Sequence, residues 1–164
     1  MDYFNKDIHL KGNHEFIQQI TSDKNSDISL FKAGIELLKI CPIIGLVKGI
    51  TSTPEKDGEK FTIFHAAIEN HKQDLEHIYR LIILLHKYDY DISNEERIKN
   101  AFTNYNDKRF FEIFDSYLYG GIKWLKEQFD ANISISPANR VNTIVRNFVS
   151  EYDIAKDCYK TTDL

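Results

Sequence analysis

Glycine and proline are scarce in this chain, whose 164 residues contain seven Gly and three Pro. Turn-rich β architectures need many of both, whereas long helices tolerate few, so their scarcity favours a helical fold. Cysteine is rarer still, with Cys41 in an apolar run and Cys158 near the C-terminus. Two scattered cysteines exclude a disulfide framework and a thiolate metal site, and they indicate free thiols in a reducing compartment.

An excess of basic residues is also missing, because 21 Lys and Arg stand against 25 Asp and Glu, a net charge of −4. Such a chain has no general attraction for phosphate backbones, so we expect no nucleic-acid partner, although the net charge does not exclude a local basic site. The first ten residues lack the basic start and apolar core of a signal peptide. We therefore expect a cytoplasmic protein.

No long apolar run in the sequence is without charged residues. In the most apolar stretch, residues 30–50, each central charge would cost about 2.5 to 3.5 kcal/mol in a membrane, so we expect a buried, kinked helix and no membrane span. Pro42 lacks an N–H group, which predicts that this run divides near Cys41 into two helices. The interrupting charges are those of Lys32, Glu36, Lys39 and Lys48.

Hydrophobic and aromatic residues are abundant, at 42% and 13% of the chain. This content fills one core, so we expect a single domain over residues 1–164, with frayed segments at 1–13 and 156–164. Residues 61–88 contain no Gly or Pro, and their apolar residues recur at spacings of three and four. The pattern predicts one helix of about 28 residues, roughly 42 Å long, around which the rest is organised. Its apolar positions are Phe61, Phe64, Ile68, Leu75, Ile78, Ile82 and Leu85.

Residues 110–129 form a second long apolar pattern, which we expect to pack against the first as its antiparallel partner. Gly120 and Gly121 lie at its middle, where each glycine costs about 0.5 to 1 kcal/mol relative to alanine. We interpret them as a point of close backbone approach to another helix.

Three shorter patterns complete the prediction of a single irregular all-α bundle of five to seven helices around two long antiparallel ones. Residues 14–21 predict a short helix, and Ser93 with Glu96 forms a capping box at the start of another. Ser136 followed by Pro137 predicts the start of the last helix. The expected buried face of that helix contains Val141, Ile144, Val145, Phe148 and Tyr152.

The leading candidate binding residues form a ladder of alternating charge on the helix predicted for 61–88. Oppositely charged side chains three or four residues apart pair along a solvated helix edge, where each pair contributes about 0.2 to 0.5 kcal/mol. Such an edge can also set the register of a partner helix. The ladder consists of Glu69, Lys72, Glu76 and Arg80.

Four of the six histidines lie in the same region. His71 occupies a core-facing position, so we expect it to bond a Tyr, an Asn or a backbone group and to fix helix register. His65 and Glu69 share a face at i, i+4 spacing and are weak candidates for metal ligands. No second His/Glu pair accompanies them, so we expect no metal and no cofactor, and a metal-binding bundle is the second alternative for the function.

Arg80 and His86 form an Arg-x5-His pair on a predicted helix of a small helical domain. The spacing resembles the Arg-x4-6-His motif of the HEPN ribonucleases, and only these two residues match. The family often has a polar residue after the arginine, where this chain has Leu81. The resemblance implies metal-independent RNA cleavage, with Arg80 binding phosphate and His86 as acid or base.

The composition and the ladder favour a different function. Two very apolar helices in a small chain have more apolar surface than one core covers, which indicates a protein partner or a homodimer. We therefore expect a small protein-interaction or regulatory module that is not an enzyme, with the ribonuclease as the first alternative.

Overall fold

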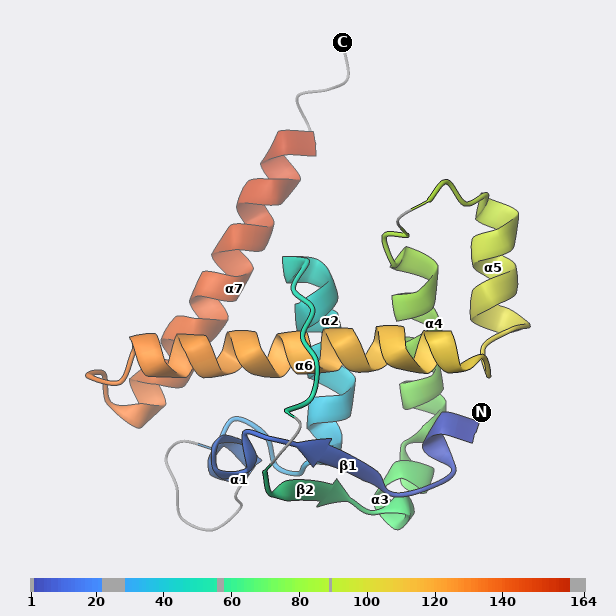
Figure 1. The fold of residues 1–164 in the computed structure, drawn as a ribbon. Coiled ribbons are helices and arrows are strands. Elements are labelled where there is room, and N and C mark those ends of the chain that lie inside the picture. Colours follow the sequence, from blue (N-terminus) through green and yellow to red (C-terminus); the bar gives the residue numbers. More distant parts are fainter. Residues whose placement is uncertain (1, 22–28, 56–57, 89, 160–164) are drawn as a thin grey trace.

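The computed structural model describes the backbone of residues 2–21, 29–55, 58–88 and 90–159, and the side chains of these residues except 137–138 and 151–159. The described residues form seven α-helices, one 3-10 turn and a two-stranded sheet (Figure 1), which confirms the all-α class. In chain order the elements are η1 (Asp2–Phe4), β1 (Ile8–Lys11), α1 (His14–Thr21), α2 (Ile35–Lys48), β2 (Lys60–Ile63), α3 (His65–Asn70), α4 (Lys72–Leu85), α5 (Asn94–Phe102), α6 (Lys108–Ala131) and α7 (Pro137–Tyr159).

Helix α6 crosses both α2 and α4 and is the true centre of the fold (Figure 1). Where α6 meets α2, the two backbones touch. A Cβ atom added to Gly121 would lie 2.0 Å from the Cys41 carbonyl oxygen, and one added to Gly45 would lie 2.2 Å from that of Tyr117. A Cβ atom added to Gly120 would lie 2.0 Å from the carbonyl oxygen of Ile50, just after the end of α2. The predicted close approach to another helix is thus confirmed at Gly121, and Gly120 meets the segment that follows that helix.

The single long helix expected over residues 61–88 is wrong, because its first residues form a strand. Lys60–Ile63 pairs antiparallel with Ile8–Lys11, with Ile63 opposite Ile8. Phe64 is extended, at φ −71° and ψ 145°, and the helix begins only at His65, whose N–H donates to Asp7 Oδ1 at 2.7 Å. Phe61 and Ile63 alternate as in a strand, a pattern that the helical spacing of Phe61, Phe64 and Ile68 concealed.

The helix breaks again at His71, whose φ of −122° and ψ of 12° separate α3 from α4. The remaining helix, α4, has only 14 residues. The architecture of two long antiparallel helices is therefore not found, because the first of them is divided into β2, α3 and α4. The second is present as α6, with 24 residues and a length of about 36 Å.

Helix α2 runs through Pro42 without the predicted division near Cys41. It ends at Gly49, which adopts φ +64° and whose N–H bonds the Leu46 carbonyl at 3.1 Å. Cys41 and Gly45 both lie against α6. We attribute the continuity of the helix to this contact, which holds the turns before and after Pro42 in line and offsets the missing hydrogen bond.

The shorter helices follow the sequence patterns closely. Helix α1 occupies residues 14–21, α5 follows Ser93, whose Oγ accepts from Glu96 N at 3.1 Å, and α7 begins at Pro137. On α7, Ile144 is buried, but Val145, predicted to be buried, is exposed, and Tyr152 lies outside the described side chains. Residues 2–13, where fraying was expected, contribute η1 and β1, with Phe4 fully buried.

Candidate functional site

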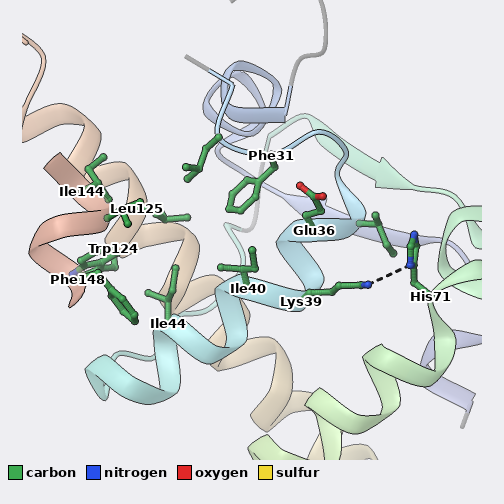
Figure 2. A pocket seen from close by; sticks show the side chains of 13 residues that line it. Phe31, Glu36, Lys39, Ile40, Ile44, His71, Trp124, Leu125, Ile144 and Phe148 are labelled. Carbon is green, nitrogen blue, oxygen red and sulfur yellow. Dashed lines mark hydrogen bonds between the residues drawn. The ribbon is translucent and has the colours of Figure 1, made fainter. Parts of the chain in front are cut away.

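The candidate site is a cavity of about 450 Å³ along the side of α2 that faces away from the glycine crossing (Figure 2). Helices α2, α6 and α7 supply most of its wall, and nearly all of that wall is apolar. The lining residues are Leu30, Phe31, Ile35, Glu36, Lys39, Ile40, Ile44, His71, Trp124, Leu125, Ile144, Val145 and Phe148.

Helix α7 forms one wall of the cavity and is anchored at its start by Arg140. The buried guanidinium of Arg140 donates to the carbonyls of Asn132, Ile133 and Ile135 at 2.8–3.2 Å, in the turn that follows α6. These charge-assisted bonds satisfy three carbonyls with one side chain and fix the direction in which α7 leaves α6. Beyond this anchor, α7 projects away from the other helices (Figure 1).

Aromatic rings close one end of the cavity. The rings of Trp124 and Phe148 meet edge to face, with centroids 5.7 Å apart. Lys48 Nζ, at the end of α2, lies 5.1 Å from both ring centroids. Partial burial lowers the pKa of this ammonium group. The two rings that line the cavity thus also hold a cation, an arrangement that links α2, α6 and α7.

Polar groups occupy the other end, where Lys39 connects α2 to α4 (Figure 2). Lys39 Nζ donates to Asp74 Oδ2 at 2.6 Å and lies 3.2 Å from His71 Nδ1. The bond from Lys39 is the largest cause that lowers the pKa of Asp74. Because an ammonium group can only donate, His71 Nδ1 is the acceptor and the ring proton lies on Nε2. His71 is half-buried, and its partner is this lysine rather than the expected Tyr, Asn or backbone group.

The apolar surface continues outside the cavity. On α2 and α7, Ile40 and Val145 line the opening, and Val47 and Val149 follow them on the same helix faces. Four side chains of this surface, each 42–50% exposed, are called the apolar face below: Ile40, Val47, Val145 and Val149.

The predicted charge ladder is divided by the break at His71. Glu69 on α3 pairs with Lys72 on α4 at 3.3 Å, and Glu76 pairs with Arg80 at 3.4 Å. The first pair is largely exposed, whereas α5 partly covers the second. The four residues thus do not form one continuous helix edge.

Arg80 and His86 contact different neighbours. The Arg80 guanidinium lies 5.7 Å from the Phe102 ring and 5.6 Å from the Tyr105 ring, on the α5 side, and its Nε is buried with no hydrogen-bond partner among the described residues. His86 Nδ1 lies 3.0 Å from the hydroxyl of Tyr117 on α6. Each side chain has a packing role on its own side of α4, and the structure does not direct the two toward one phosphate position.

The weak metal candidates also remain a pair. His65 Nε2 lies 3.6 Å from Glu69 Oε2 at the start and end of α3. Among the residues that the structure describes, no group of three or more His, Cys, Asp or Glu side chains could hold a metal ion. A stable metal site in a protein generally needs at least three such ligands.

A second cavity, of about 480 Å³, was not predicted from the sequence. It lies between β1, Pro54 and α6, where the Tyr3 hydroxyl donates to Asp115 and Lys11 N donates to the Tyr119 hydroxyl at 3.0 Å. Burial raises the pKa of Asp115 to about 6. Asp115 is separated from Tyr3 by 112 positions, so only its place beside the apolar stripe of α6 could have indicated a buried carboxyl group.

Comparisons with known proteins do not indicate a function for this site. No protein-family model, no curated protein and no solved structure matches the chain. Within the described residues, no helix is both long enough and apolar enough to cross a membrane.

Proposed function

We propose that this protein is a protein-interaction module that binds an α-helical surface of its partner against the apolar face. The observation that carries this proposal is the environment of α2. Helix α2 has apolar residues on every side, a property of helices that are buried all round. Its α6 side is closed by direct backbone contact, whereas Ile40 and Val47 remain exposed on the opposite side.

The apolar face has the form that a helix-in-groove interaction requires. Exposed side chains on α2 and α7 flank the cavity, so a helix laid along α2 would contact both. Burying a whole Val or Ile side chain contributes about 1.5 to 3 kcal/mol, and these four are already about half covered. The remaining gain is of the order of several kcal/mol before the cost of association, which is sufficient for a reversible complex.

The polar end of the cavity would set the direction of the partner. Lys39 is held by Asp74 and His71, so its ammonium group is preorganised instead of mobile. A partner helix that presents a polar group here gains a bond in one orientation and loses it in the other. We further propose a cytoplasmic location, which agrees with the free, buried thiol of Cys41.

A display library of amphipathic helical peptides tests the proposal. We expect the folded protein to select peptides with one apolar stripe, and Ile40→Glu to abolish their binding because it places a charge at the centre of the apolar face. The matched control is Ile133→Glu, which changes an exposed isoleucine in the turn after α6. Selected peptides that bind Ile40→Glu as well as they bind the wild type would refute the proposal.

A further inference from the structure

We infer that the second cavity, between β1 and α6, binds a small organic ammonium ion whose charged group pairs with the carboxylate of Asp115. This site is independent of the proposed function, because it shares no lining residue with the cavity beside α2. Its volume of about 480 Å³ lies within the usual range of ligand pockets in proteins. A small organic molecule therefore fits this space.

The carboxyl group of Asp115 is half-buried and only partly satisfied. Its Oδ1 atom accepts from the Tyr3 hydroxyl, whereas Oδ2 has no hydrogen-bond partner among the residues that the structure describes. Within the same residues, Asp115 forms no ion pair. A carboxylate that is withdrawn from water without a cation beside it is costly, so a ligand that supplies the cation gains free energy from pairing with it.

The walls of the cavity and its rim differ in polarity. Four buried side chains, two of them aliphatic and two aromatic, form the walls around Asp115: Tyr3, Ile8, Leu10 and Tyr119. The other ionisable residues that line the cavity are exposed: Lys6, Asp7, His9 and Lys11. A ligand with an apolar body and one ammonium group matches apolar walls around a single half-buried carboxylate.

The two lysines at the rim would favour an anion, but their charges have less weight than that of Asp115. Lys6 and Lys11 are exposed, so water and salt screen their charges. The charge of Lys6 lowers the pKa of Asp115, an effect smaller than that of burial, and Lys6 forms no ion pair with it in the described part of the chain. The exposed carboxylate of Asp7 also offsets one of the lysines. The less solvated charge of Asp115 therefore decides the sign of the ligand.

The protonation of Asp115 supports this assignment. Burial raises its pKa to about 6, so the carboxyl group is charged above this pH and neutral below it. The ionisable groups that face it are Tyr3 of η1, Lys6, Glu112 and Tyr119 of α6, and Tyr79 of α4. Burial raises the pKa of all three tyrosines, which therefore stay neutral near pH 6. An ammonium ligand should bind tightly above that pH and weakly below it.

Isothermal titration calorimetry of the full chain with three probes of similar shape tests the site. The probes are phenethylamine, which carries an ammonium group at about pH 8, the neutral phenethyl alcohol and the anionic phenylacetate. We expect the amine to bind at least about tenfold more tightly than either of the others, because only the amine forms a charge-assisted bond with the carboxylate. Its affinity should fall about tenfold between about pH 8 and about pH 5, since Asp115 becomes neutral.

The variant Asp115→Asn removes the charge and keeps an acceptor for the Tyr3 hydroxyl. It should bind the amine no more tightly than the alcohol. Glu112→Gln is the matched control, because it removes an exposed carboxylate one turn away on α6 that does not line the cavity, and it should retain the preference for the amine. Circular dichroism checks that each variant folds. If Asp115→Asn does not fold, the pH dependence of the wild type decides.

Three results would overturn the inference. The first is a wild type without a preference for the amine, including one that binds none of the three probes. The second is a preference for the amine that persists in folded Asp115→Asn. The third is an affinity for the amine that is the same on both sides of the raised pKa of Asp115.

Discussion

The two sides of the apolar helix α2 are covered in opposite ways. On the α6 side, Gly45, Gly120 and Gly121 present no side chain at the crossing, so at these positions the backbones themselves meet. On the α7 side, large side chains such as Ile40 and Val145 hold the helices apart and leave a cavity of about 450 Å³. Close contact makes the first side a structural element, and the incomplete cover of the second is the reason why we propose it as a binding surface.

The largest effect is expected where the backbones touch. Gly121→Ala places a methyl group against the Cys41 carbonyl, which cannot yield as a flexible side chain would, so we expect a loss of about 3 to 5 kcal/mol in unfolding free energy. Urea denaturation measures it. Lys123→Ala, at an exposed position on the same helix, is the control and should change stability by less than about 0.5 kcal/mol. A Gly121→Ala protein as stable as the wild type would show that the crossing is looser than described.

Shortening one side chain on each side of α2 tests this comparison. Leu38 is fully buried, and Leu38→Ala should cost about 2 to 4 kcal/mol through the lost contacts and the cavity left behind. Ile40→Ala, two residues further along the same helix, should cost less than about 1 kcal/mol when measured at a concentration where the protein is monomeric. Equal losses in thermal or urea unfolding would mean that the two sides are covered equally.

The sequence predicted those parts of the fold that depend on local patterns. Helix α6 follows from its apolar spacing, and α5 and α7 follow from cap signals at Ser93 and Pro137. The close approach at Gly120 and Gly121 was also predictable, because two glycines inside a helix carry a cost that a contact must offset. In each case the signal in the sequence lies within a few residues.

Features that depend on distant segments escaped the sequence. Residues 60–63 are a strand because residues 8–11 pair with them, and α3 begins at His65 because Asp7 accepts from its N–H group. The cavity likewise depends on the angle at which Arg140 holds α7. Spacing along the chain contains no information about these partners, so Phe61 and Phe64 fitted a helix that does not form.

Helix α6 also carries the titratable group Asp115, beside the cavity between β1 and α6. Its raised pKa of about 6 means that the folded protein holds this proton more tightly than the unfolded chain. Stability is therefore highest below the ordinary pKa of aspartate and falls as the pH rises through about 6, by up to about 3 kcal/mol.

Asp115→Asn tests this dependence, since the amide stays neutral and can still accept from the Tyr3 hydroxyl. At pH values above the raised pKa we expect the variant to be about 2 kcal/mol more stable than the wild type, with the difference vanishing in acid. Urea unfolding as a function of pH measures it, with Asp130→Asn as an exposed control. A wild type that becomes more stable as the pH rises through 6 would contradict the assignment.

The smallest effect is expected at the charge ladder. Lys72→Ala removes the exposed pair with Glu69, which joins α3 to α4 across the break at His71. Exposed pairs contribute little, so the loss should be below about 0.5 kcal/mol and should shrink further in high salt. A thermal-unfolding loss above about 1 kcal/mol would make the ladder an important link between the two helices.

Thiol labelling at neighbouring positions on α2 tests the central claim most directly. In a variant that combines Ile40→Cys with Cys158→Ser, the introduced thiol lies on the open side, whereas the native Cys41, fully buried with a raised pKa, lies on the closed side. We predict that the introduced thiol reacts rapidly in the folded protein while Cys41 stays unreactive. An introduced thiol as unreactive as Cys41 would contradict this account.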